Sequence, residues 1–178
     1  MLIYFTTLTN LLQMHKLQLV PECYAETAMV KELFLDFVYI NHAYGIGKVC
    51  SILKKEDVRD YINIGFVDND KHLPPYLDSY EELGRANNVV FKKHPHTNDY
   101  IIMVNPAIEK FLLSQLNEIE KSPSDYDLPD DFKEFKHKLK TQSIQNHSGF
   151  KRMLTDLKNS RPDGIRFIID KVNFLQNN

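Results

Sequence analysis

Three acidic residues stand where two apolar segments of the chain end. Glu22 comes directly after the apolar segment 17–20 and Pro21, and Asp68 and Asp70 come directly after the apolar run 61–67. Two residues apart in an extended chain, the side chains of Asp68 and Asp70 point the same way, which suits joint binding of a cation. Carboxylate oxygens are ligands that Mg²⁺ and Mn²⁺ prefer, whereas zinc favours His and Cys. The three residues therefore predict a divalent-cation site.

An ordinary structural role stays open for each of these residues. Aspartate after a strand often accepts hydrogen bonds from nearby backbone in a turn. An acidic residue just before a helix interacts favourably with the helix dipole. The spacing alone does not separate capping from cation binding.

The elements that must position these residues follow from the apolar pattern. We expect strands at 17–20 and 61–67, helices from residue 25 through about 39 and over 49–58, and a loop at 45–48. A continuous apolar run such as 61–67 is typical of a strand buried on both faces of a parallel sheet. Ligands of such sheets bind outside the carboxyl ends of the strands, so Glu22, Asp68 and Asp70 are expected in one crevice.

The rest of the chain extends this α/β pattern. We expect a short helix at 76–83, strands at 88–91 and 100–104, a helix from Pro106 through about 119, and helices at 131–141, 149–159 and 164–175. At 178 residues the chain has the length of one domain. We predict a single α/β domain over 1–178, with a mostly parallel sheet flanked by helices. Its core would cover about 17–120, and a helical C-terminal extension about 121–178.

A glutamate after a first strand and Asp-x-Asp after a later apolar strand resemble the TOPRIM pattern of topoisomerases, primases, and old-family and M5-type nucleases. The resemblance covers about residues 17–113. The segment 106–111, in which Glu109 opens a late helix, is similar to small stand-alone TOPRIM-like proteins. This resemblance makes Glu109 a candidate fourth ligand and implies a TOPRIM-like, Rossmann-like fold.

The resemblance also implies a function. It implies Mg²⁺-dependent (or Mn²⁺-dependent) phosphoryl transfer or hydrolysis on nucleic acid, as in a nuclease, with Asp68 and Asp70 as metal ligands and Glu22 as ligand and general acid or base. Lys71, next to Asp70, could hold a phosphate or neutralise developing charge, although a solvated turn lysine is the commoner role. Cys23 stands where TOPRIM proteins usually carry glycine. This departure favours the alternative of a non-catalytic binding or regulatory subunit of a larger complex.

Charge is unevenly distributed along a chain of formal net charge −2. From Glu56 to Glu82 eight acidic residues accompany two basic ones, and from Lys133 to Arg161 eight basic residues accompany two acidic ones. An acidic centre beside a basic surface fits binding of a nucleic-acid backbone, and a solvated helix face is the plainer explanation. Nucleic acid is the expected partner. A homodimer or a larger protein complex also stays open.

Cysteine use and the N-terminal segment bear on location. Cys23 and Cys50 are too few and too far apart for a disulfide framework or a zinc finger. The segment 1–20 lacks a basic first region and a small-residue cleavage site, and polar residues interrupt its apolar stretch. We therefore expect a cytoplasmic protein without a membrane span.

Overall fold

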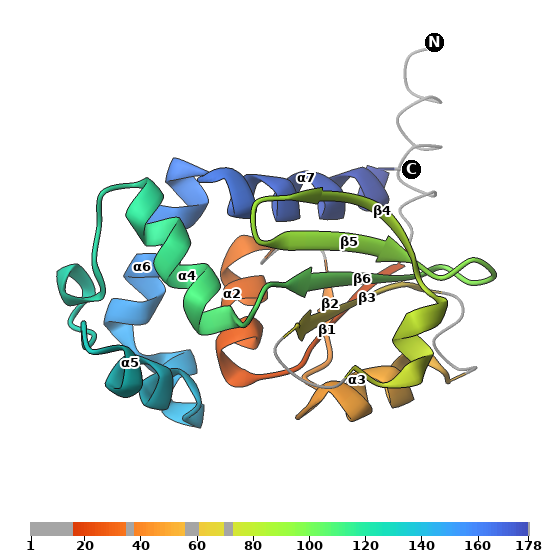
Figure 1. Cartoon of the computed structure of the whole chain (residues 1–178), viewed down its shortest axis with the longest axis horizontal. Helices are drawn as coiled ribbons and strands as arrows, with labels where there is room; N and C mark the ends of the chain where they lie inside the picture. The colour runs from red at the N-terminus through yellow and green to blue at the C-terminus, as the bar shows by residue number, and fades with distance from the viewer. Residues whose placement is uncertain (1–15, 35–37, 56–60, 70–72, 178) are drawn as a thin grey trace, which may run out of the picture.

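A six-stranded sheet forms the centre of the computed structural model, which describes residues 16–34, 38–55, 61–69 and 73–177 (Figure 1). The strand order is β2-β1-β3-β6-β5-β4. In chain order the strands are β1 Lys16–Pro21, β2 Tyr39–Ile40, β3 Tyr61–Asp68, β4 Glu81–Ala86, β5 Val89–Lys93 and β6 Asp99–Val104. β2, β1, β3 and β6 are parallel, β5 pairs with β6 in the antiparallel sense, and β4 pairs with β5 in the antiparallel sense. The predicted α/β class with a mostly parallel sheet is confirmed.

Helices cover both faces of this sheet. Because side chains of a strand alternate between faces, Ile62, Ile64 and Phe66 of β3 join one hydrophobic cluster, and Val67 joins the other. α3 (Ile46–Leu53) and the 3₁₀ turn Pro75–Ser79 cover the Val67 face. The opposite face packs against α2 (Tyr24–Leu33), α4 (Ile108–Glu118), α6 (Ser148–Ser160) and α7 (Asp163–Asn177), and α5 (Phe132–Leu139) packs beside α4.

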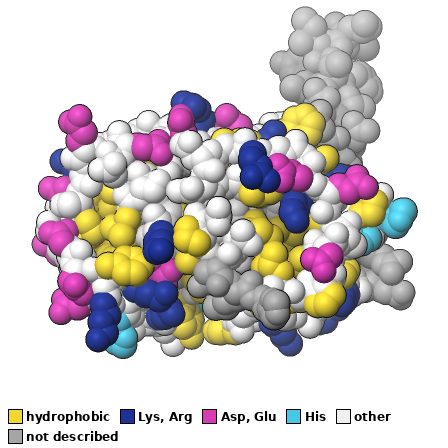
Figure 2. Space-filling model, viewed as in Figure 1, with side chains coloured by type: hydrophobic (Ala, Val, Ile, Leu, Met, Phe, Trp, Pro, Cys, Tyr) yellow, Lys and Arg dark blue, Asp and Glu magenta, His cyan; other side chains and the backbone are white. Residues whose placement is uncertain are grey.

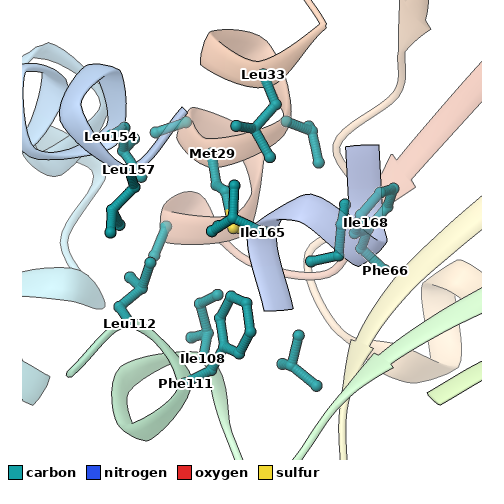
Figure 3. Packing of buried hydrophobic residues seen from close by; sticks show 14 of the residues in the cluster. Met29, Leu33, Phe66, Ile108, Phe111, Leu112, Leu154, Leu157, Ile165 and Ile168 are labelled. Carbon is teal, nitrogen blue, oxygen red and sulfur yellow. The ribbon is translucent and has the colours of Figure 1, made fainter. Parts of the chain in front are cut away.

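The C-terminal helices share the core of the sheet. Leu154 and Leu157 of α6 and Ile165 and Ile168 of α7 point into the same cluster as Met29 of α2 (Figure 3). All of these side chains are fully or almost fully buried. Of the helices expected over 121–178, α7 therefore contacts β4 and β5 of the sheet directly, whereas α6 packs on α2 and α7, and α5 packs on α4.

Two of the expected helices give way in part to strands, and the helix expected over 49–58 is α3, Ile46–Leu53, which begins inside the loop expected at 45–48. The helix predicted through about residue 39 ends at Leu33, and Tyr39–Ile40 form β2 against β1. The helix predicted at 76–83 is a 3₁₀ turn, Pro75–Ser79, followed by β4. β4 is an edge strand, and most of its side chains are exposed. Its extended conformation therefore depends on pairing with β5 and shows no apolar periodicity in the sequence. Within the described residues no helix is long and apolar enough to cross a bilayer.

Candidate active site

Glu22 lies in a tight connection between β1 and α2. Its backbone N–H donates to the carbonyl of Phe66 in β3 (3.1 Å) and to Oε2 of Glu26 (2.8 Å). Cys23 is the N-cap of α2, and its side chain accepts from the Glu26 N–H while Glu26 accepts from the Cys23 N–H, a reciprocal capping box. These contacts hold the Glu22 side chain at the carboxyl end of β1, where it is 7% exposed.

The structure brings Asp68 next to Glu22. Asp68 is the last residue of β3, the strand that pairs in parallel with β1. Its backbone N–H donates to Oε2 of Glu22 at 3.3 Å. Its own Oδ1 accepts from the N–H of Ile108, at 2.8 Å, in the first turn of α4. Asp68 thus caps a helix and also stands beside a second carboxylate, so both roles considered for it are compatible with this geometry.

Asp70 and Lys71 lie outside the described residues. The predicted pairing of Asp68 with Asp70, and the phosphate-binding role of Lys71, therefore stay predictions.

Glu109 is buried in the first turn of α4, next to the residue that Asp68 caps. Its Oε1 lies 3.9 Å from Nζ of Lys136 in α5. This ion pair joins α5 to the N-terminal end of α4 and gives Glu109 a structural role. Its role as a fourth ligand stays a prediction.

Glu26 is a third carboxylate of this centre, and our sequence interpretation missed it. Its side chain is 1% exposed, and Oε2 accepts from the N–H groups of Glu22 and Cys23. Oε1 is the one buried side-chain nitrogen or oxygen within the described residues that lacks a hydrogen-bond partner. Burial, then the negative charges of Asp68 and Glu22, raise the pKa of Glu26 well above its usual range. The signal available in the sequence was the capping-box spacing Cys-x-x-Glu.

Cys23 does not have the properties of a thiolate nucleophile. Burial, followed by the charges of Glu26 and Asp68, strongly raises the pKa of its thiol. A reactive cysteine needs the opposite, a pKa lowered by a cation or a basic partner. Cys23 therefore serves here as the helix cap.

Glu22, Glu26 and Asp68 together fit a divalent cation by the chemistry of their donors. When all three groups are ionised their charges repel one another, and a cation placed among them would offset this repulsion and favour the ionised form of Glu26. Oε1 of Glu26 has no hydrogen-bond partner, so this oxygen is available as a metal ligand. Among the described residues no three His, Cys, Asp or Glu side chains already surround one cation-sized point. Binding would therefore require side-chain rotation or ligands from the rest of the chain.

A second polar region lies at the opposite end of the sheet. Gln18 donates to Asn63 (3.1 Å), and Asn63 donates to Asp99 (2.8 Å), which also accepts from Thr97 (2.6 Å). Gln18, Asn63 and Asp99 stand in register on β1, β3 and β6, and all three are buried. Their hydrogen bonds satisfy one another across the sheet, so we interpret this row as structural.

Comparison of the chain with protein-family models, with curated proteins and with solved structures gave no significant match.

Proposed function

We propose that this protein is a divalent-cation-dependent enzyme of phosphoryl transfer or phosphodiester hydrolysis on nucleic acid. The observation that carries the proposal is the contact between Glu22 and Asp68 at the carboxyl ends of the adjacent parallel strands β1 and β3. The buried Glu26 beside them adds a third carboxylate. Such an oxygen-rich centre suits Mg²⁺ or Mn²⁺.

The roles proposed for the chain's residues follow from this arrangement. Glu22, Glu26 and Asp68, together with Asp70, would hold the ion, whose chemistry is to polarise a phosphoryl oxygen. The Ile108 N–H fixes the orientation of Asp68, because Oδ1 accepts from it. Glu22, positioned by the Asp68 N–H, is the proposed general acid or base. Lys71 is the proposed partner of a phosphate oxygen.

A basic surface next to this centre supports nucleic acid as the substrate. α5 carries a stripe of basic residues at i, i+3, i+4 and i+7, namely Lys133, Lys136, His137 and Lys140. Figure 2 shows Lys, Arg and His side chains gathered over the α5 region, at the lower left. The Glu109–Lys136 ion pair joins this helix to the end of α4 that Asp68 caps. A phosphate backbone lying along α5 would therefore pass near the carboxylates.

Replacing Asp68 with asparagine tests the proposal. Asparagine keeps Oδ1 as an acceptor for the Ile108 N–H but removes the negative charge, so we expect a folded protein that binds Mg²⁺ or Mn²⁺ at least about tenfold more weakly. Calorimetric titration of both ions measures this. Asp78→Asn, the same change at an exposed aspartate of the 3₁₀ turn Pro75–Ser79, is the matched control.

Two results would contradict this proposal. One is absence of millimolar binding by the wild type, and the other is equal affinity of the wild type and folded Asp68→Asn. Cation binding without cleavage of DNA or RNA would instead favour the non-catalytic subunit. Cys23, in the place where a TOPRIM glycine would let a phosphate approach the backbone, is the feature that favours this second function.

A further inference from the structure

Three aromatic rings form a cluster directly beside the carboxylate centre. The ring centroids of Tyr24 and His42 are 5.0 Å apart, those of His42 and Tyr44 are 3.9 Å apart, and those of Tyr24 and Tyr44 are 6.0 Å apart. Tyr24 begins α2, whereas His42 and Tyr44 lie in the loop after β2, and backbone hydrogen bonds join this loop to the β1–α2 connection. Ala43 N–H donates to the carbonyl of Pro21 and Gly45 N–H to that of Glu22, each at 2.9 Å.

The inner part of this cluster is rigidly held. Thr27 is 2% exposed, and its hydroxyl donates its single proton to the carbonyl of Cys23 at 2.8 Å. The same hydroxyl is in hydrogen-bond contact with Nδ1 of His42, which orients the imidazole ring. Tyr24, in the first turn of α2, packs on the same ring. The imidazole ring of His42 is therefore held in place before any ligand binds.

The outer ring of the cluster faces solvent. Tyr44 is 72% exposed, the largest value among the exposed large hydrophobic side chains of the described residues. Its φ of 58° lies in the left-handed region, which is unfavourable for a bulky residue, and Gly45 follows at φ 118°. Strained backbone of this kind persists where the surrounding structure imposes it and is common at ligand sites. The loop therefore displays the Tyr44 ring next to Gly45, whose N–H donates to the Glu22 carbonyl.

The position of this face indicates what it would bind. A nucleobase in a duplex is stacked on its neighbours, so its face is not accessible to a protein ring, whereas an unpaired base can stack on tyrosine or histidine. Lys48, exposed in the first turn of α3, follows the same loop and supplies a cation for the attached phosphate. An aromatic face with a neighbouring lysine is the usual combination in sites for single-stranded nucleic acid.

We propose that the exposed ring of Tyr44, supported from beneath by the tilted rings of His42 and Tyr24, is a stacking platform that receives an unpaired base next to the scissile phosphate, so that the substrate is single-stranded nucleic acid. This inference rests on the proposed function, because it requires the scissile phosphate to bind at the carboxylate centre, beside the aromatic rings. It adds a substrate class, and it assigns recognition to a base rather than to the backbone alone.

Binding of a short labelled oligothymidylate and of a duplex of equal length, followed by fluorescence anisotropy in EDTA, tests the platform without cleavage. We expect the wild type to prefer the single strand and Tyr44→Ala to bind it about tenfold more weakly. Tyr44→Phe, which keeps the ring, should bind like the wild type. Tyr39→Ala is the matched control, because Tyr39 is also an exposed tyrosine, 59% exposed, on the adjoining strand β2.

Several outcomes would overturn the platform: equal binding of single strand and duplex by the wild type, an equal loss in Tyr44→Ala and Tyr39→Ala, or no loss in a folded Tyr44→Ala. The cation titration is independent of this measurement. Normal Mg²⁺ binding combined with an unaffected Tyr44→Ala would reject the platform and leave the proposed enzyme intact. A Tyr44-dependent single-strand preference without any cation binding would reject the enzyme and support the platform as a binding site.

Discussion

Replacing Gly149 with alanine is expected to destabilise the fold by about 3 kcal/mol or more, the upper end of the usual cost of overpacking. Gly149 is buried at the second position of α6. A Cβ atom there would lie 1.7 Å from the carbonyl oxygen of Tyr126 and 2.8 Å from its carbonyl carbon. Backbone cannot move aside as a side-chain end can, so α6 or the 3₁₀ turn Pro123–Tyr126 must shift. The midpoint of urea unfolding, followed by circular dichroism, measures the loss.

The loss of stability is expected to extend beyond the first turn of α6, because this helix contributes several side chains to the hydrophobic core. Met153, Leu154 and Leu157 of α6 are buried against α2 and α7. A shift of the helix start would loosen these contacts together with the hydrogen bond from Tyr126 Oη to Asp156. Insoluble expression of Gly149→Ala would agree with this expectation.

Gly47→Ala is the matched control for this prediction. Gly47 is also in the first turn of a helix, α3, but it is exposed and a Cβ atom there would meet nothing within 4 Å. Alanine has a higher helix propensity than glycine, so we expect this variant to be unchanged or more stable by up to about 1 kcal/mol. A stability of Gly149→Ala equal to that of Gly47→Ala would contradict the described packing of α6.

The central strands could be predicted from the sequence because they are continuously apolar. The runs 17–20, 61–67 and 100–104 became β1, β3 and β6, which are neighbours in the middle of the sheet. β2 and β4 could not be predicted in this way. β2 has only two residues, and β4 begins with the exposed Glu81 and Glu82, so neither shows a strand period. Tertiary pairing, which the local sequence does not encode, places both at the edges.

The site could be predicted only in part for a related reason. Glu22 and Asp68 each follow a predicted strand, so parallel pairing of β1 with β3 brings them together. Glu26 lies on a helix, where an acidic residue is usually solvated, and only the packing of α2 reveals that its side chain is buried. The aromatic cluster depends on β2, which places His42 and Tyr44 beside Tyr24. Because β2 was not predicted, this cluster was not predicted either.

Without a divalent cation, the free energy of unfolding is expected to decrease as pH rises above about 5. The cause is Glu26, whose pKa is raised in the folded chain by burial and by Asp68 and Glu22. Above the ordinary pKa of glutamate, the unfolded chain has lost a proton that the folded chain still holds. Stability is then fully present at low pH and is lost as pH rises toward the folded pKa, with a limiting slope of about 1.4 kcal/mol per pH unit. Urea unfolding in EDTA at several pH values measures this slope.

Glu26→Gln should remove most of this pH dependence. The glutamine oxygen can still accept from the Glu22 and Cys23 N–H groups, so the start of α2 is preserved, while the buried charge is absent at every pH. Glu81→Gln, the same change at an exposed position of β4, is the matched control and should keep the wild-type slope. An equal slope in Glu26→Gln and wild type would contradict the assignment of the pH dependence to Glu26.

Mg²⁺ should oppose this pH dependence in the wild type if the ion binds among Glu22, Glu26 and Asp68. A cation favours the charged form of Glu26, so binding releases a proton and strengthens as pH rises. Because a ligand that binds only the folded chain stabilises it, Mg²⁺ should raise the unfolding midpoint more at pH 8 than at pH 6. In Glu26→Gln that difference should shrink, since the proton it depends on is gone. An ion whose stabilising effect is the same in both proteins at both pH values would bind away from Glu26, and the third carboxylate would then be only the cap of α2.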